Sequence, residues 1–204
     1  MTPGAKPSKA EPPRVPVMHL LAGPNGAGKS SFVEQVLAPI TSLPFINADV
    51  IAARRWPDAQ AEHAYNASTE AAVIRSQLIA KRESFITETV FSHVSKLALL
   101  REARDAGYLV HLHVVVVPVE LSVARVAMRV AAGGHAVPEA KVRERYKRLW
   151  RLVASAIEIA DAAAIYDSSQ GGFREIARYF DGVRTELSPW PAWSPHELRT
   201  QGSP

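Results

Sequence analysis

One glycine-rich stretch carries most of the information in this sequence: Gly23-Pro24-Asn25-Gly26-Ala27-Gly28-Lys29-Ser30. It matches the phosphate-binding loop pattern GxxxxGK[ST] at every defined position. An apolar run, residues 15–22, precedes it, and a helical pattern, residues 31–37, follows it. This is the strand–loop–helix setting that the motif requires, so a glycine-rich turn that matches by chance is the weaker alternative.

The chemistry of such a loop is well defined. Glycines allow consecutive backbone N–H groups to turn toward a phosphate chain, and the following helix N-terminus favours anions. Lys29 is expected to reach the β and γ phosphates, and the Ser30 hydroxyl to bind Mg²⁺. The sequence therefore predicts binding of ATP, with GTP as the alternative, together with Mg²⁺. The predicted nucleotide-binding residues are Gly23, Pro24, Asn25, Gly26, Ala27, Gly28, Lys29, Ser30, Ser31, Arg125 and Arg129.

Composition narrows the class of protein. The chain has 204 residues, 24 basic and 20 acidic, so its net charge of +4 does not by itself indicate nucleic-acid binding. It contains no cysteine, which excludes a disulfide framework and thiolate metal ligands. No apolar run approaches the roughly 20 residues of a membrane span, and no signal-peptide pattern opens the chain. We expect a cytoplasmic protein without a membrane partner.

Short β-rich runs alternate with longer helical patterns between two proline-containing tails. Strands are predicted at residues 15–22, 44–47, 84–88, 108–117 and 162–166, and helices at 31–37, 61–82, 93–106, 121–132, 139–160 and 173–180. This alternation predicts a three-layer α/β/α sandwich with a mostly parallel, five- or six-stranded sheet. Residues 1–14 are predicted to be a flexible leader, residues 15–186 one domain, and residues 187–204 a non-helical tail that Trp190 and Trp193 dock onto the body.

Polar residues follow the second and third predicted strands, whose carboxyl ends share one crevice with the loop. Asp49 could accept the proton of an acceptor hydroxyl or help to hold Mg²⁺, or it could cap the helix after it. Glu88 and Thr89 could contact the second substrate or a metal-bound water, or cap the next helix. Since no aspartate ends the fourth strand, Asp49 or Glu88 must replace the usual Walker B carboxylate, and the sequence leaves both open.

Residues 125–151 form a basic region around a glycine-hinged turn, which predicts a helical lid over the nucleotide. Its basic residues are Arg125, Arg129, Lys141, Arg143, Arg145, Lys147, Arg148 and Arg151. The alternatives are a solvated basic helix and a nucleic-acid surface, and the second lacks aromatic residues arranged for base stacking. His135 lies in the turn and is the histidine of interest, whereas His111 and His113 are expected to be satisfied core residues.

Four segments together resemble the zeta-toxin family of P-loop kinases, in particular its short chromosomal members. They are the loop with its preceding Ala22, Phe45-Ile46-Asn47-Ala48-Asp49, Ile86-Thr87-Glu88-Thr89, and Gly133-Gly134-His135-Ala136-Val137-Pro138-Glu139 with Arg143-Glu144-Arg145-Tyr146. The resemblance implies phosphorylation by ATP of the 3′-hydroxyl on the sugar of UDP-N-acetylglucosamine, and an antitoxin protein as a partner.

The resemblance also implies roles for individual residues. Asp49 looks like the catalytic base, acting with Lys29 and with Arg129 as a lid arginine that Arg125 or Arg145 would assist. The implied substrate-binding residues are Asn47, Asp49, Glu88, Thr89, His135 and Arg145.

One departure from the family leaves the acceptor open. Well-studied members follow the glutamate strand with Gly-Thr-x-Arg, whose arginine helps to hold the substrate, but this chain has Val90-Phe91-Ser92. Another nucleotide sugar, a nucleoside, a nucleotide or a different hydroxyl acceptor therefore remains an alternative on the same fold. A nucleotide-gated nucleic-acid-binding module is the non-catalytic alternative.

Overall fold

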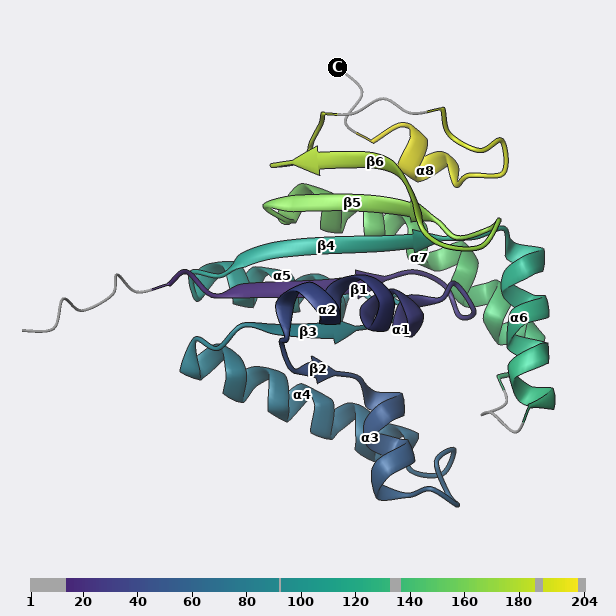
Figure 1. Cartoon of the computed structure of the whole chain (residues 1–204), viewed down its shortest axis with the longest axis horizontal. Coiled ribbons are helices and arrows are strands. Elements are labelled where there is room, and N and C mark those ends of the chain that lie inside the picture. The colour runs from purple at the N-terminus through teal and green to yellow at the C-terminus, as the bar shows by residue number, and fades with distance from the viewer. Residues whose placement is uncertain (1–13, 92, 133–136, 186–188, 202–204) are drawn as a thin grey trace, which may run out of the picture.

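A seven-stranded sheet forms the centre of the computed structural model, which describes residues 14–91, 93–132, 137–185 and 189–201 (Figure 1). The strand order across the sheet is β2-β3-β1-β4-β5-β6-β7. The strands are β1 (Val17–Ala22), β2 (Phe45–Ile46), β3 (Phe85–Glu88), β4 (Leu109–Val116), β5 (Ala162–Asp167), β6 (Arg174–Phe180) and β7 (Val183–Arg184).

The first five strands are parallel, and the last two add to the sheet in antiparallel fashion. All five predicted strands are present, so the mostly parallel α/β fold is confirmed. The predicted number of five or six strands is wrong, because β6 and β7 extend the sheet to seven strands. The register pairs Leu21 of β1 with Glu88 of β3 and Ala22 with Val114 of β4. This register brings Glu88 to the end of the sheet where β1 runs into the glycine-rich loop.

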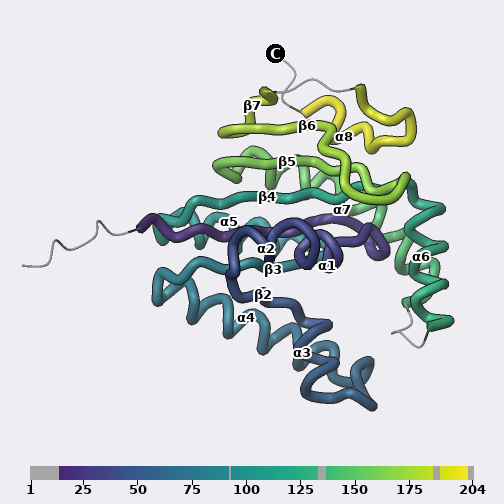
Figure 2. The backbone as a smooth tube through the Cα atoms, in the orientation of Figure 1, coloured from purple at the N-terminus to yellow at the C-terminus, as the bar shows by residue number. Residues whose placement is uncertain are grey.

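Helices cover both faces of the sheet. They are α1 (Lys29–Phe32), the π-helical stretch η1 (Val33–Leu37), α2 (Ala38–Thr41), α3 (Ala48–Arg55), α4 (Ala64–Lys81), α5 (Ser95–Asp105), α6 (Val119–Ala131), α7 (Glu139–Ile159) and α8 (His196–Arg199). The larger core cluster joins the sheet to α4, α5 and α7, and the smaller one joins it to α1 and η1. The backbone trace places α6 beyond the carboxyl ends of the central strands (Figure 2).

The prediction of a helix over residues 173–180 is wrong, because β6 occupies most of this segment. Ile176, Ala177 and Tyr179 are buried, and β6 pairs with β5 from Asp167↔Arg174 to Ala162↔Phe180. An unpaired edge of β5 would leave its backbone N–H and C=O groups without partners, and pairing with β6 satisfies them. A tertiary requirement therefore overrides the local pattern.

The carboxyl-terminal tail is partly helical, contrary to expectation. The single turn α8 follows Pro195, a position at which proline does not interrupt a helix. Trp190 and Trp193 are partly buried and pack against the larger core cluster, as the sequence predicted. In the part of the chain that the structure describes, no helix combines the length and the apolar character needed to cross a membrane.

Candidate active site

The glycine-rich loop is wedged between β4 and α6, and two of its glycines are required by that position. Gly23 has φ +145°, and a Cβ there would lie 2.3 Å from the Val115 carbonyl oxygen. Gly26 has φ +72°, and a Cβ there would lie 2.7 Å from the Ser122 carbonyl oxygen. No other residue type fits either position without moving the backbone.

Side chains from outside the loop hold three consecutive loop carbonyls. The Ser122 hydroxyl donates to the Asn25 carbonyl at 2.6 Å, and the Ser168 hydroxyl donates to the Ala27 carbonyl at 2.8 Å. Between them, the Arg125 guanidinium donates to the Gly26 carbonyl at 3.3 Å. Tying these carbonyls to the surrounding protein is what a phosphate-binding loop needs, because its N–H groups must serve the ligand.

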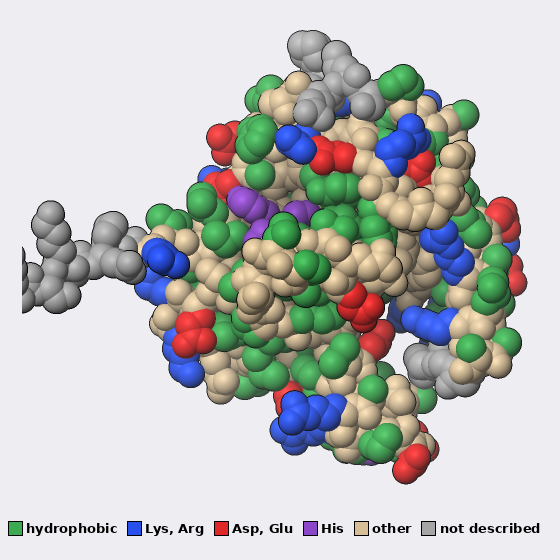
Figure 3. Space-filling view, in the orientation of Figure 1, with side chains coloured by type: hydrophobic (Ala, Val, Ile, Leu, Met, Phe, Trp, Pro, Cys, Tyr) green, Lys and Arg blue, Asp and Glu red, His purple; other side chains and the backbone are tan. Residues whose placement is uncertain are grey.

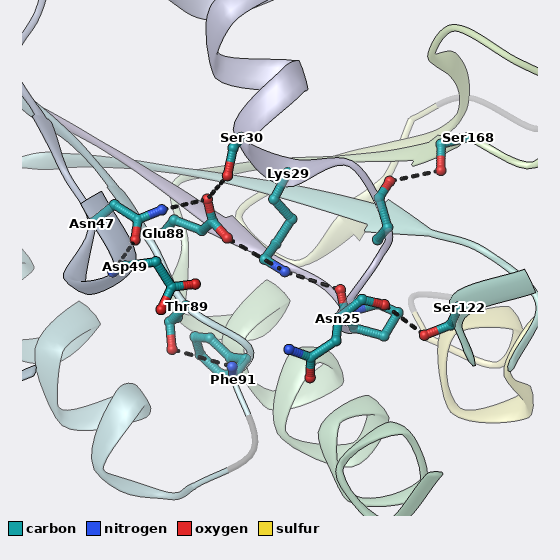
Figure 4. A network of polar contacts seen from close by, with 12 residues as sticks. Asn25, Lys29, Ser30, Asn47, Asp49, Glu88, Thr89, Phe91, Ser122 and Ser168 are labelled. Carbon is teal, nitrogen blue, oxygen red and sulfur yellow. Dashed lines mark hydrogen bonds and ion pairs between the residues drawn. The ribbon is translucent and has the colours of Figure 1, made fainter. Parts of the chain in front are cut away.

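Glu88 is the centre of the polar network beside the loop (Figure 4). Its Oε2 accepts hydrogen bonds from the Ser30 hydroxyl at 2.8 Å and from Asn47 Nδ2 at 2.9 Å. Its Oε1 lies 3.5 Å from Lys29 Nζ, which also donates to the Pro24 carbonyl at 2.9 Å. Lys29 is only 5% exposed, so its charge is compensated by Glu88 rather than by water.

Asn47, and not Asp49, caps the helix that follows β2. The Asn47 side chain accepts a hydrogen bond of 2.7 Å from the Asp49 backbone N–H, and its φ and ψ are extended, as in an N-cap residue. The capping interpretation of Asp49 is therefore wrong. Asp49 lies in the first turn of α3 with an exposed side chain.

A cavity of about 370 Å³ brings together the polar residues that follow β2 and β3. Its lining residues are Asn47, Ala48, Asp49, Ala64, Ser68, Ala71, Arg75, Glu88, Thr89, Val90, Lys96 and Arg145. We call it the acceptor cavity.

Glu88 and Thr89 do not cap the next helix, because α5 begins only at Ser95. The Thr89 hydroxyl instead accepts a hydrogen bond of 3.2 Å from the Phe91 N–H.

A second cavity of about 270 Å³ borders the loop on α1 and on the β5–β6 connection. Its lining residues are Gly26, Ala27, Gly28, Ser31, Gln35, Arg125, Ser168, Gly171, Gly172 and Phe173. The second cavity thus borders the glycine-rich loop directly, whereas the acceptor cavity is joined to the loop through Glu88, which contacts Lys29 and Ser30. In the space-filling view, acidic and basic side chains rim a hollow between α6 and the body of the protein (Figure 3).

The predicted lid residues are placed differently from one another. Arg125 is bound to the loop and also donates to the Ser168 carbonyl at 2.8 Å. Arg129 is exposed one helical turn further on, and Arg145 of α7 lines the acceptor cavity. Arg143 binds both carboxylate oxygens of Glu120 at 2.7 Å and so ties α7 to α6. His135 and the glycine hinge lie outside the described residues.

The histidines on β1 and β4 are not all satisfied, contrary to expectation. His19 Nδ1 and His113 Nε2 lie 3.0 Å apart, but His113 Nδ1 is buried with no hydrogen-bond partner among the described residues. Burial, with His111 nearby, lowers the pKa of His19 to about 4. Burial, with His19 and His111 nearby, lowers the pKa of His113 to about 3. The ring contacts of this cluster are to Phe32 and Tyr166, away from the acceptor cavity.

Sequence reasoning missed Arg75 and Lys96 in the acceptor cavity. A signal was present for the first, because Ala64, Ser68, Ala71 and Arg75 recur at intervals of three or four and therefore share one face of α4. It also missed Ser122 and Ser168, which no local pattern marks.

The site suits Mg²⁺ by the chemistry of its donors. The Ser30 hydroxyl and the Glu88 carboxylate, already in contact, supply the hard oxygen ligands that this ion prefers. Mg²⁺ is usually bound by one or two such protein groups together with substrate phosphates, so two protein oxygens beside a phosphate loop are sufficient.

Residues 18–152 match the model of a family described as the AAA domain. The match covers the phosphate-binding loop, the carboxylate strand and α6, and the chain belongs to this family. No curated protein matches the sequence.

Solved structures with the same fold include kinases and a component of a toxin–antitoxin system. A chain from the AvrRxo1-ORF1:-ORF2 complex with ATP superposes with a TM-score of 0.67 at 16% identity, covering 84% of this chain and 60% of that one. The PezAT chromosomal toxin–antitoxin system of Streptococcus pneumoniae gives 0.58 at 15% identity, covering 78% and 71%. Shikimate kinase from Acinetobacter baumannii, in complex with shikimate, gives 0.53 at 19% identity, covering 76% and 86%. This chain thus spans three-fifths of the AvrRxo1 chain, and it has the fold of P-loop kinases.

Proposed function

We propose that this protein is a kinase that transfers the γ-phosphate of ATP to a hydroxyl group of an acceptor held in the acceptor cavity. The observation that carries the proposal is the position of Glu88. It contacts the two polar residues that end the phosphate loop, Lys29 and Ser30, and lines the acceptor cavity together with Asp49. A phosphate donor and a hydroxyl acceptor would therefore meet at this carboxylate.

The roles follow from these contacts. Lys29 would exchange its contacts with Pro24 and Glu88 for phosphate oxygens and balance their charge. Ser30 and Glu88 would hold Mg²⁺, which when bound neutralises charge on the phosphates. Asn47 fixes the Glu88 carboxylate by a hydrogen bond and starts α3, on which Asp49 is carried.

Asp49 would be the catalytic base. As the acceptor oxygen forms its bond to the γ-phosphorus, the bond from that phosphorus to the bridging oxygen of ADP breaks, and the hydroxyl proton passes to the Asp49 carboxylate. An exposed carboxylate in the first helical turn is available for this, because the cap contact of Asp49 with Asn47 uses only its backbone N–H. Arg129 would complete the site as a lid arginine that reaches the transferred phosphate.

The acceptor that we propose first is a nucleotide sugar, UDP-N-acetylglucosamine, on the strength of the zeta-toxin resemblance and of the PezAT structural neighbour. Other nucleosides, nucleotides and small hydroxyl acceptors are the alternatives. The protein would act where ATP and nucleotide sugars are found, in the cytoplasm. Because two of the neighbours come from two-component complexes, we also propose a protein partner that restrains the activity.

Transfer of labelled γ-phosphate to a panel of UDP-sugars, nucleosides and NAD tests the proposal. We expect label on an acceptor with the wild type, a 10²- to 10⁴-fold slower transfer in Asp49→Asn with ATP binding retained, and loss of ATP binding in Lys29→Ala. Label on an acceptor other than UDP-N-acetylglucosamine would support the proposed kinase activity and identify a different substrate. No transfer to any acceptor, with ATP bound, would refute the proposal and favour the nucleotide-gated binding module.

A further inference from the structure

Three cationic side chains from three different helices line the acceptor cavity. They are Arg75 of α4, Lys96 at the start of α5, and Arg145 of α7, and each is partly buried. The helices α4 and α5 flank the strand that ends in Glu88, and α7 packs against α5. The cavity therefore contains three cationic side chains, and they come from other elements of the chain than its carboxylates, Asp49 and Glu88.

None of the three cations has a hydrogen bond or an ion pair with another side chain in the described part of the molecule. The contrast with neighbouring arginines is clear, because Arg55 pairs with Glu70 at 2.9 Å and Arg143 pairs with Glu120 at 2.7 Å. Glu88 is not available as a partner, since Lys29, Ser30 and Asn47 already surround its carboxylate.

Partial burial makes the proximity of these positive charges unfavourable unless an anion is bound. Burial lowers the pKa of Arg75, and Glu102 opposes that effect only in part. Burial lowers the pKa of Lys96 as well, with the positive charge of Arg75 as the next cause. Like charges held close together and partly removed from water are destabilising until an opposite charge joins them.

We propose that Arg75, Lys96 and Arg145 bind an anionic group of the acceptor, a phosphate or a carboxylate, and thereby turn its hydroxyl toward Asp49. This inference rests on the proposed function and narrows the acceptor to molecules that carry negative charge apart from the reacting hydroxyl. Arginine pairs with such groups through two parallel hydrogen bonds, and lysine adds a point charge. A neutral sugar or nucleoside would leave all three cations without a partner.

Binding of a small anion tests the cationic site independently of catalysis. A non-hydrolysable ATP analogue with Mg²⁺ first fills the phosphate loop, and calorimetry then measures binding of pyrophosphate in one series and of citrate in another. We expect the Kd of the better anion to rise about tenfold or more in Arg75→Gln and in Lys96→Gln. The matched controls are Lys81→Gln on α4 and Arg101→Gln on α5, exposed positions outside the cavity, for which the Kd should not change.

The two probes distinguish the sources of charge, because tighter binding of pyrophosphate indicates a phosphorylated acceptor and tighter binding of citrate indicates a carboxylate. Thermal unfolding of each variant ensures that a loss of binding is not a loss of folding. Absence of binding to both probes in the wild type, or an equal Kd in wild type and cavity variants, would overturn the proposal.

Kinetics then separate this proposal from the proposed function. With UDP-N-acetylglucosamine and uncharged N-acetylglucosamine as a matched pair, we expect transfer to the charged acceptor only, and a raised KM with little change of kcat in Arg75→Gln. If kcat/KM were equal for both acceptors and unaffected by Arg75→Gln, the anion site would be refuted, whereas the proposed kinase activity would still stand. Anion binding that depends on Arg75, without phosphoryl transfer to any acceptor, would support the anion site and refute the kinase.

Discussion

The Ser30 hydroxyl donates a hydrogen bond of 2.8 Å to the Glu88 carboxylate, so the end of the phosphate loop and the end of β3 are joined directly. The two residues are 58 positions apart in the chain and meet because β1 and β3 are neighbours in the sheet. In the proposed function, this contact would place Glu88, rather than an aspartate on β4, as the metal-binding carboxylate. Asp49 would then be left for proton transfer.

Glu88→Gln should therefore affect metal use more than nucleotide binding. The amide keeps the size of the side chain but loses the charge that Mg²⁺ and Lys29 require. We expect the Mg²⁺ concentration for half-maximal transfer to rise about 10- to 100-fold, whereas ATP affinity without metal changes only slightly. The measurement is phosphoryl transfer against Mg²⁺ concentration. Glu83→Gln, at an exposed position just before β3, is the control, and equal curves for Glu88→Gln and wild type would show that Glu88 is not a metal ligand.

A second prediction concerns the fit of the loop against α6. In Gly26→Ala the added methyl group would lie 2.7 Å from the Ser122 carbonyl oxygen at a φ of +72°. We expect the free energy of unfolding to fall by about 1–3 kcal/mol and ATP affinity to fall with it. The measurements are urea unfolding and ATP titration.

Gly171→Ala is the matched control, since Gly171 also has a positive φ, +82°, but nothing lies within 4 Å of the position that a Cβ would take there. It should show only the backbone strain of a left-handed residue, about 1 kcal/mol. If both variants lost the same stability, close packing of the loop on α6 would contribute nothing.

Much of the fold could be predicted from the sequence because strands buried on both faces are recognisable one by one as apolar runs. β4 is rich in valine and is covered on both faces, so its residues identify it without knowledge of its neighbours. β6 has no such mark. Its extended conformation depends on pairing with β5, and a pattern of mixed polar and apolar residues does not reveal the partner.

The same distinction applies to the site. Lys29, Asp49 and Glu88 could be grouped in advance, because the carboxyl ends of parallel strands converge at one edge of a sheet. Ser122 and Ser168 contact loop carbonyls 97 and 141 positions away, and Arg75 and Lys96 converge only when α4 and α5 pack on the sheet. Contacts of this kind are set by tertiary packing and leave no short motif.

The two arginines of α6 should have separable effects. Arg125 holds the Gly26 carbonyl and the Ser168 carbonyl, so Arg125→Gln should loosen the loop and weaken ATP binding about tenfold. Arg129 makes none of these contacts. If it acts as a lid arginine, Arg129→Gln should lower kcat about 10²-fold or more and leave the affinity for ATP unchanged. ATP titration and single-turnover transfer measure the two effects. Arg148→Gln on the exposed face of α7 is the control, and an unchanged kcat in Arg129→Gln would remove Arg129 from the catalytic machinery.

Stability should fall on mild acidification because of His19 and His113. Burial lowers the pKa of His19 to about 4 and that of His113 to about 3, whereas an unfolded histidine titrates near 6.5. Below pH 6.5 the unfolded chain therefore binds protons that the folded chain does not, and stability is lost as the pH falls toward 4. The upper limit is about 2 kcal/mol per histidine between pH 7 and pH 5.

Urea unfolding of the wild type and of His113→Leu between pH 7 and pH 5 tests this directly. The leucine removes the linked proton of His113 and its unpartnered Nδ1, although it also leaves His19 Nδ1 without its contact. Burial lowers the pKa of His111 as well, so the variant keeps two of the three linked histidines. We expect the free energy of unfolding of the variant to fall less steeply with decreasing pH than that of the wild type. If the stability of the variant and of the wild type fell equally steeply with pH, the acid sensitivity would arise elsewhere. Burial would then not be what keeps His113 neutral in the folded protein.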